Sequence, residues 1–180
     1  MRFFIISVIA LAISVVPCFG QSDPLNLDFN LPGPQTKAHQ TYLGILPGQS
    51  FTLNQVKADI LIVEIFSMYC PICQREATKV NQLYKTIQAL DNPSVKIIGI
   101  GAGNSAFEVA FFKENYKIEF PLFSDGNFHI HKILGEKGTP FFMGISPQKT
   151  GPKVFFTHSG EIKDIHLFVE RLLNRSQQRN

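Results

Sequence analysis

The sequence predicts an α/β fold in which a central mixed β-sheet is flanked by helices. Apolar, strand-like runs at 59–66 and 95–100 are each followed by a helical segment, an alternation that is typical of parallel strands. A final pair of strands at 141–146 and 153–158 adds an antiparallel hairpin, which makes the sheet mixed. The chain of 180 residues is long enough for one domain with a short appendage, and its hydrophobic fraction of 44% excludes wholesale disorder.

The first twenty residues are expected to be an export signal. Arg2 supplies the positive charge, residues 3–16 form the apolar core, and Pro17 ends it. Cleavage is expected near Gly20, which places the mature protein in an extracytoplasmic, periplasmic location. The alternative is an uncleaved membrane anchor through residues 3–19, with the domain facing the periplasm. Because the net charge is only +3 and no charge run exists, nucleic acid is not expected as a partner.

Two cysteines remain after the signal, in the sequence Cys70-Pro71-Ile72-Cys73. A disulfide across so small a loop is expected to stabilise the folded state by about 2 kcal/mol, against about 4.7 kcal/mol for a loop of 100 residues. A purely structural disulfide is therefore a poor explanation of the pair. Zinc needs about four ligands, which no second cysteine pair or nearby histidine pair supplies, and haem attachment needs a histidine where Gln74 stands. The pair therefore favours thiol–disulfide exchange, with no metal and no cofactor beyond the redox-active disulfide Cys70–Cys73.

The cysteine pair lies at a junction between a strand and a helix. Residues 59–66 form the strand, Pro71 suits the first position of the helix because it has no N–H, and helical periodicity continues to Leu90. Cys70 is then the N-cap, where unpaired N–H groups and the helix dipole favour a thiolate, and Cys73 lies one turn further along. Stabilising the Cys70 thiolate stabilises the reduced dithiol, which makes the pair more oxidising.

The remaining elements follow from capping signals and periodicity. A capping-box pattern at 105–108 opens a helix through about Tyr116, and Gly135 ends a short helix at 125–134. Apolar periodicity at 165–173 predicts a closing amphipathic helix. The expected division of the chain is a signal peptide or anchor (1–20), an irregular or short-stranded N-terminal extension (21–48), one α/β domain (49–174) and a frayed tail (175–180).

With these elements in place, the chain resembles the thioredoxin-fold thiol–disulfide oxidoreductases, in particular the exported TlpA-like (redoxin) branch. The resemblance covers about residues 27–173 and implies a thioredoxin-like fold with an N-terminal extension and an inserted helix. It rests on the order and spacing of several segments: D-F-N-L-P (28–32) with F-T-L (51–53), the strand–turn–CxxC–helix core (62–73), the next parallel strand (95–100), F-P-L-F-S-D (120–125) and G-T-P-F-F (138–142).

The resemblance implies roles for the residues around the motif. Cys70 is expected to be the exposed nucleophile, Cys73 the partly buried resolving thiol, and Pro140 the cis-proline of the loop opposite them. Residues expected to contact the client are Tyr69, Pro71, Ile72 and Thr139, the last through its backbone. The implied partners are envelope proteins that carry thiols or disulfides, together with a membrane or envelope redox partner. Reduction of apocytochromes during cytochrome c maturation is one form of this function.

Two acidic residues are further candidates for the site. Glu64 lies mid-strand, where burying a carboxylate costs free energy, and its position matches the buried acid of thioredoxins that assists proton transfer at the resolving cysteine. The alternative is a solvated strand end or a paired buried glutamate. Glu76 lies one turn beyond Cys73 and matches an acid found in relatives. An acid early in a helix is also ordinary dipole complementation, so both explanations stay open for Glu76.

Three other functions compete with protein disulfide exchange. The sequence from Ser67 to Cys70 resembles the S-x-x-C that positions a peroxidatic cysteine, although Val63 occupies the place where thiol peroxidases carry proline. A non-enzymatic carrier could hold Cu(I) between the two thiols. A structural domain without redox activity is the least favoured, because the cysteine pair is intact.

Overall fold

The structure of the protein, a computed structural model, describes residues 25, 27–90, 93–148 and 151–178. The expected signal peptide and the alternative anchor at 3–19 lie outside these residues. Within the described ranges, no helix is both long enough and apolar enough to cross a membrane.

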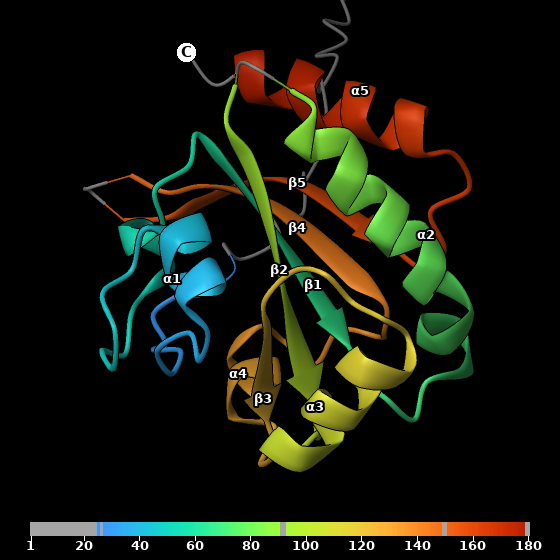
Figure 1. Ribbon diagram of the computed structural model, residues 1–180. Helices are drawn as coiled ribbons and strands as arrows, with labels where there is room; N and C mark the ends of the chain where they lie inside the picture. Colours follow the sequence, from blue (N-terminus) through green and yellow to red (C-terminus); the bar gives the residue numbers. More distant parts are fainter. Residues whose placement is uncertain (1–24, 26, 91–92, 149–150, 179–180) are drawn as a thin grey trace, which may run out of the picture.

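A five-stranded mixed sheet forms the centre of the molecule, with the strand order β3-β2-β1-β4-β5 (Figure 1). The strands are β1 (Ile60–Phe66), β2 (Val95–Ala102), β3 (Leu122–Asp125), β4 (Phe141–Ser146) and β5 (Lys153–Ser159). β1 is parallel to β2 and antiparallel to β4, and β5 closes the sheet as the second strand of a hairpin with β4. The predicted mixed α/β sheet is therefore confirmed.

Every residue of β1 is buried because the strand lies in the middle of a sheet that is covered on both faces. Successive side chains of a strand point to opposite faces. Leu61, Val63 and Ile65 accordingly belong to one hydrophobic cluster, whereas Ile60 and Ile62 belong to the other. The apolar run at 59–66 in the sequence is thus explained by a strand that is covered on both faces of the sheet.

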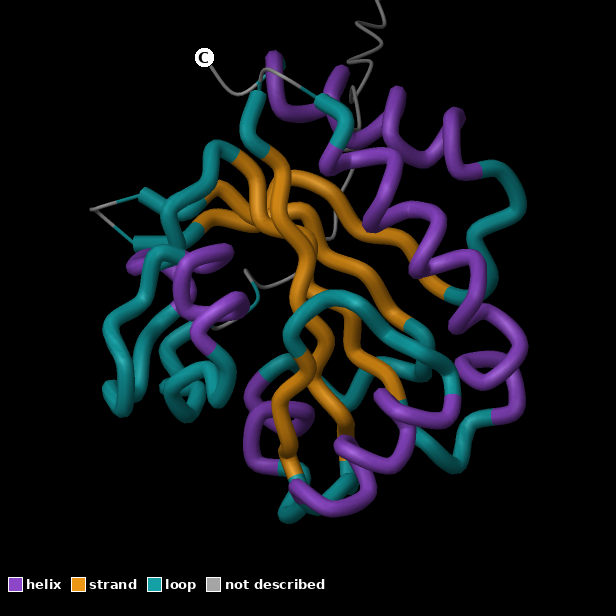
Figure 2. Tube along the Cα trace, viewed as in Figure 1, coloured by secondary structure: helices purple, strands orange, loops and turns teal. Residues whose placement is uncertain are grey.

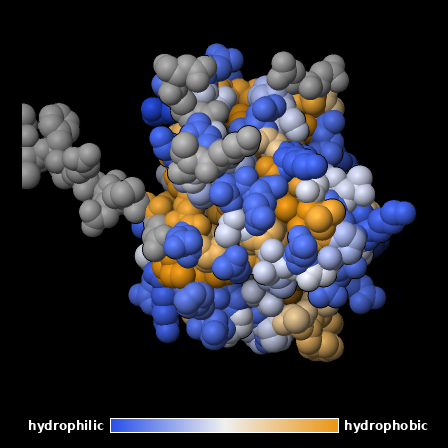
Figure 3. Space-filling model, turned by 90° about the vertical axis from the view of Figure 1, so that its left-hand side faces the viewer, coloured by the Kyte–Doolittle hydropathy of each residue, from blue (hydrophilic) through white to orange (hydrophobic). Residues whose placement is uncertain are grey.

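The helices divide between these two faces (Figures 1 and 2). One face carries α2 (Pro71–Gln88), α3 (Ala106–Asn115) and α5 (Ile165–Gln177), whose apolar residues form one cluster with the sheet. The N-terminal extension with α1 (Lys37–Leu43), the short 3-10 helix Leu53–Gln55 and α4 (His129–Ile133) packs on the other face. Figure 3 views the molecule from the side of α1 and shows apolar surface between hydrophilic side chains.

Three sequence predictions need correction. The extension, expected to be irregular or short-stranded, contains the helix α1, which Thr36 caps at its N-terminus and Gly44 ends in the left-handed conformation. The tail is not frayed from residue 175, since α5 continues to Gln177. The helix expected at 125–134 is shorter, because Asp125 ends β3 and its carboxylate accepts hydrogen bonds from the first turn of α4, at the N–H groups of Ile130 (3.0 Å) and His131 (2.8 Å).

Candidate active site

Cys70 occupies the N-cap position of α2, directly after the turn that follows β1. Its backbone N–H donates to the Ser67 carbonyl oxygen at 3.0 Å, which closes that turn. The backbone of Cys70 is extended, and Pro71 begins the helix at the first position. The Cys73 N–H, one of the amides that the helix leaves unpaired, points at Cys70 Sγ at 3.4 Å. A sulfur replaces the oxygen of a usual N-cap side chain here.

The environment of Cys70 stabilises its thiolate. Partial burial opposes this by disfavouring the charged form, but hydrogen bonds to the sulfur outweigh the burial and leave the pKa of Cys70 below its usual value. The donors are the Thr139 side chain, the Cys73 and Ile72 backbone N–H groups and the Cys73 side chain. Both cysteines are free thiols, and Cys70 is half-buried, so its sulfur can be reached from solvent.

Cys73 lies one turn into α2 and faces the core, with an exposed fraction of 2%. Burial raises the pKa of its thiol, and the hydrogen bond with Cys70 and the negative charge of Glu64 raise it further, while the Ser67 backbone acts in the opposite direction. The two thiols therefore differ in their ionisation, because one is at the helix end and the other is beneath it.

The loop before β4 lies against Cys70. The Thr139–Pro140 peptide bond is cis, which is the geometry that the resemblance implied for Pro140. The Thr139 carbonyl oxygen is 3.3 Å from Cys70 Sγ and accepts its thiol hydrogen bond. β4 places the loop there because Phe141, its first residue, pairs with Ile65 near the end of β1.

Glu64 lies in the middle of β1, between Gly99 of β2 and Phe142 of β4, and its side chain is buried. By the alternation of β1 it points to the face covered by α2, the helix that carries Cys73. Burial raises the pKa of Glu64 to about 8, and the neighbouring charge of Glu76 adds to the shift. The carboxyl is not at a solvated strand end, which removes one of the two alternatives for this residue.

Glu76 is also buried, on the inner side of α2. One carboxylate oxygen lies 3.0 Å from Lys79 Nζ, and the other accepts the backbone N–H of Ile162 at 2.8 Å. Ile162 belongs to the segment before α5, so Glu76 links α2 to that segment. A surface residue that merely complements the helix dipole would not be buried with both oxygens engaged.

Tyr69 is the exposed residue of the active-site turn, with 65% of its surface accessible. Its hydroxyl donates to the Glu108 carboxylate at the start of α3, and this hydrogen bond raises the pKa of Tyr69 and lowers the pKa of Glu108. Pro71 is exposed and Ile72 is half-buried beside it. Tyr69, Pro71 and Ile72, three of the residues expected to contact a client, are thus at least partly exposed next to Cys70 in the chain.

Sequence reasoning missed one residue that positions the turn. Asn104 follows β2 and is fully buried, and its side-chain oxygen accepts the Met68 backbone N–H at 2.9 Å. Because β1 and β2 are parallel, the residues that follow them meet at the same edge of the sheet, and this signal could have identified Asn104.

Within the described part of the chain, no group of three or more His, Cys, Asp or Glu side chains could hold a metal ion.

Comparisons with known proteins find a matching family and several relatives. Residues 27–164 match the AhpC/TSA family. The chain is similar to the thiol–disulfide oxidoreductase ResA of Halalkalibacterium halodurans, with 23% identity over 121 residues that cover 67% of this chain and 61% of ResA. The match therefore spans less than two thirds of the length of that relative.

Two solved structures show the same fold. The thiol:disulfide interchange protein DsbE of Chlorobium tepidum aligns with a TM-score of 0.63 and 19% identity, covering 86% of this chain and 96% of DsbE. Peroxidoxin BcpB of Mycobacterium tuberculosis aligns with a TM-score of 0.59 and 19% identity, covering 88% and 96%. These likenesses confirm the predicted thioredoxin-like fold.

Proposed function

The chain belongs to the AhpC/TSA family, and from that premise we propose that it is a thiol–disulfide oxidoreductase that exchanges disulfides with other proteins through Cys70 and Cys73. One observation carries the proposal: a half-buried thiol with a lowered pKa lies at a helix N-cap, one turn before a buried thiol with a raised pKa. The cis-proline loop beside Cys70 offers backbone groups to a client chain. No cofactor is needed beyond the Cys70–Cys73 disulfide.

In the reductive direction, the Cys70 thiolate attacks one sulfur of a client disulfide. A mixed disulfide forms, and the other client sulfur leaves as a thiolate that takes up a proton. Cys73 then loses its proton and attacks Cys70 Sγ, which forms the Cys70–Cys73 disulfide and releases the second client thiolate. The client is reduced by two electrons and the motif is oxidised by two. A low pKa at Cys70 helps the oxidative direction instead, in which the second client thiolate attacks the client sulfur of the mixed disulfide and Cys70 leaves as a thiolate.

The resolving step needs a proton acceptor, because burial holds the Cys73 thiol protonated. We propose Glu64 for this role, since its pKa of about 8 lets it hold and release a proton near neutral pH. Glu76 is proposed as a positioning residue: it is fixed by Lys79 and Ile162, and its charge acts on Glu64.

The expected location is extracytoplasmic, on the strength of the apolar segment that follows Arg2. Clients are then envelope proteins with exposed thiols or disulfides, and a membrane or envelope partner restores the redox state of the motif. Reduction of apocytochromes for cytochrome c maturation is the most specific form of this proposal.

The proposal is tested by trapping clients. In a Cys73→Ala variant expressed in the native envelope, the mixed disulfide on Cys70 cannot be resolved and should accumulate. We expect adducts that disappear on reduction and are absent from a Cys70→Ala, Cys73→Ala control. If the variant collects no protein adducts and the wild-type protein fails to reduce insulin disulfides, protein exchange is the wrong assignment.

A thiol peroxidase is the second candidate, and the likeness to peroxidoxin BcpB favours it. Turnover of hydrogen peroxide with dithiothreitol separates the two. Peroxidase activity that is lost in Cys70→Ser and retained in Cys73→Ser would favour the peroxidase, because dithiothreitol can replace the resolving thiol in that reaction.

A further inference from the structure

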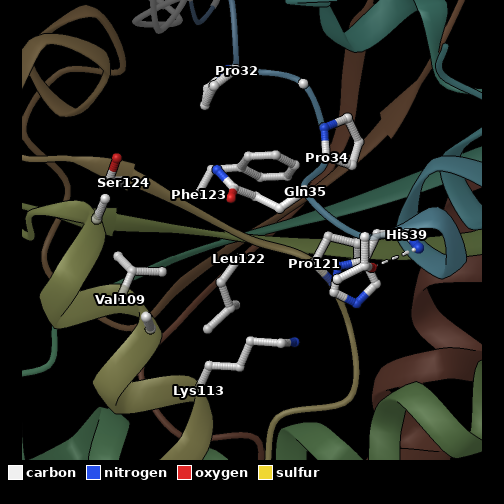
Figure 4. Close-up of a pocket in the computed structure, with 14 residues that line it drawn as sticks. Pro32, Pro34, Gln35, His39, Val109, Lys113, Pro121, Leu122, Phe123 and Ser124 are labelled. Atoms are coloured by element: carbon white, nitrogen blue, oxygen red, sulfur yellow. Dashed lines mark hydrogen bonds between the residues drawn. The ribbon is translucent and has the colours of Figure 1, made fainter. Parts of the chain in front are cut away.

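A cavity of about 320 Å³ lies along the outer edge of β3, away from the two cysteines (Figure 4). Its floor is formed by residues 121–124, one wall by the extended segment 32–36, and the other by α3 through Val109 and Lys113. We refer to this cavity as the β3 groove. Its volume is within the range of small ligand-binding sites, and most of its lining side chains are apolar.

The floor of the β3 groove is an open strand edge. β3 ends the sheet and pairs only with β2 among the described strands. The carbonyl oxygens of Pro121 and Asp125 accept hydrogen bonds from the side of β2, at 2.9 Å from Gly99 N in the strand and 2.9 Å from Gly103 N directly after it. Since backbone groups of a strand alternate in direction, the N–H and C=O groups of Leu122 and Ser124 point away from β2, into the groove.

The two walls enclose this edge from both faces of the sheet. Phe123 packs in the cluster on the side of the N-terminal extension, whereas Leu122 packs on the side of α3. A strand added beside β3 would place its own alternating side chains against these same two walls. An edge that is merely exposed would offer hydrogen bonds without such walls.

The end of the β3 groove where β3 begins carries two basic side chains. Lys113 Nζ donates to the carbonyl oxygens of Ile118 (2.8 Å) and Phe120 (2.5 Å), and His39 lines the same cavity. Burial lowers the pKa of Lys113 to about 8, and burial together with the Lys113 charge lowers the pKa of His39. Figure 4 shows Lys113 extending from α3 towards the side where His39 lies.

No Asp or Glu belongs to the lining of the β3 groove. The acid that acts on Lys113 is Glu119, whose carboxylate lies 2.8 Å from Lys85 Nζ. The charge of Lys113 disfavours protonation of His39, and the cavity holds no acid, so this end of the groove is complementary to a carboxylate supplied by a ligand.

We propose that the β3 groove binds an extended segment of a partner polypeptide, which pairs with Leu122 and Ser124 as a sixth strand and places an acidic residue beside Lys113 and His39. An extended peptide matches all three features of the groove. Its backbone can pair with the free N–H and C=O groups of β3, its side chains can pack against the walls on both faces, and an acidic residue can lie at the basic end. This binding does not depend on the dithiol, so it stands apart from the proposed redox function.

The probe is a library of phage-displayed heptapeptides, selected on a Cys70→Ser, Cys73→Ser variant that cannot capture peptides covalently. We expect enrichment of extended sequences rich in β-branched and aromatic residues, with Asp or Glu towards one end. An enriched peptide is then synthesised together with its amide counterpart, in which Glu is replaced by Gln or Asp by Asn.

Matched variants locate the binding. Ser124→Pro removes an N–H that faces the groove and no hydrogen bond to β2, and it should weaken peptide binding at least about tenfold. Ser124→Ala keeps that N–H and should bind normally. Lys113→Met should bring the affinity of the acidic peptide down to that of its amide counterpart, while leaving the counterpart unchanged. Insulin reduction by the same variants with intact cysteines should equal that of the wild type.

Three results would overturn the proposal. One is a selection that enriches no sequence family. The second is a peptide whose binding survives both Ser124→Pro and Ala110→Arg, a surface change on α3 that narrows the groove without altering the strand. The third is concentration-dependent dimerisation, measured by sedimentation, that Ser124→Pro abolishes, because the groove would then be filled by a second copy of the chain.

Discussion

Cys70 and Cys73 are three residues apart on one helix, but their thiols have opposite acid–base properties. Cys70 is at the helix N-cap, where hydrogen bonds from Thr139 and from unpaired amides lower its pKa. Cys73 is one turn deeper, where burial and the charge of Glu64 raise its pKa. The side-chain chemistry is identical, so the difference comes from position alone.

This difference assigns an order to the chemistry. The thiol that is accessible and more easily ionised reacts first, and the buried thiol, which is harder to ionise, reacts second, after its proton has been removed. We propose that the neighbouring acid Glu64 acts in the second step, because its charge opposes ionisation of Cys73 and its own pKa is close to neutral.

Cys70→Ser should abolish disulfide exchange. The serine hydroxyl cannot act as the nucleophile, and the buried Cys73 has neither the access nor the ionisation to replace it. We expect insulin reduction to fall by on the order of a thousandfold or more, to the uncatalysed rate. The helix should remain folded, as serine is a good N-cap residue, and circular dichroism provides this control. Residual turnover that requires Cys73 would contradict the assigned order.

Single-cysteine variants measure the two thiols separately. In Cys73→Ser, alkylation of Cys70 by iodoacetamide should have a pH midpoint below that of an unperturbed thiol, because its thiolate is stabilised. In Cys70→Ser, alkylation of Cys73 should be slower at every pH and should show no plateau below about pH 9. Similar rates and midpoints in the two variants would mean that position on the helix does not separate the thiols.

Glu64→Gln should alter both the resolving step and the dependence of stability on pH. As a neutral side chain cannot accept the Cys73 proton, release of client from the mixed disulfide should slow by on the order of a hundredfold. The control is the first step, measured as alkylation of Cys70, which should change little. A variant that resolves mixed disulfides at the wild-type rate would remove Glu64 from the mechanism.

The stability prediction has a definite sign. Folding raises the pKa of Glu64 from 4.5 to about 8. Between these two pH values the folded protein holds a proton that the unfolded chain has released, so the free energy of unfolding falls as the pH rises through this window. Glu64→Gln should remove that fall, which amounts to a few kcal/mol at most, at roughly 1.4 kcal/mol per pKa unit. Urea unfolding at pH 5, 7 and 9 measures it.

The sequence predicted those parts of the active site that lie close together along the chain. Cys70, Pro71 and Cys73 are adjacent, and the change from strand to helix around them can be seen from composition and periodicity. The cis-proline loop was identified only through the family resemblance, because nothing local to Pro140 reveals that β4 brings it beside the cysteines.

Contacts between distant segments were not predictable in this way. The hydrogen bond between Asn104 and Met68 joins residues 36 apart in sequence, and the bond between Glu76 and Ile162 joins residues 86 apart. Each depends on the strand order and on which face a helix covers, and no periodicity encodes these. For Glu64 the sequence indicated burial, but only the structure shows a second acid acting on it.

Glu76→Gln should have the smallest effect, and it tests whether the two buried acids act on each other. The amide oxygen can still accept the Ile162 N–H, so the link between α2 and the segment before α5 is kept, while the ion pair with Lys79 is lost. Because the charge of Glu76 contributes to the raised pKa of Glu64, its removal should move that pKa downwards. The pH midpoint of mixed-disulfide resolution should shift to lower pH by less than about one unit, with the rate at the optimum nearly unchanged. An unshifted midpoint would mean that burial alone sets the pKa of Glu64, and that Glu76 serves the fold rather than the reaction.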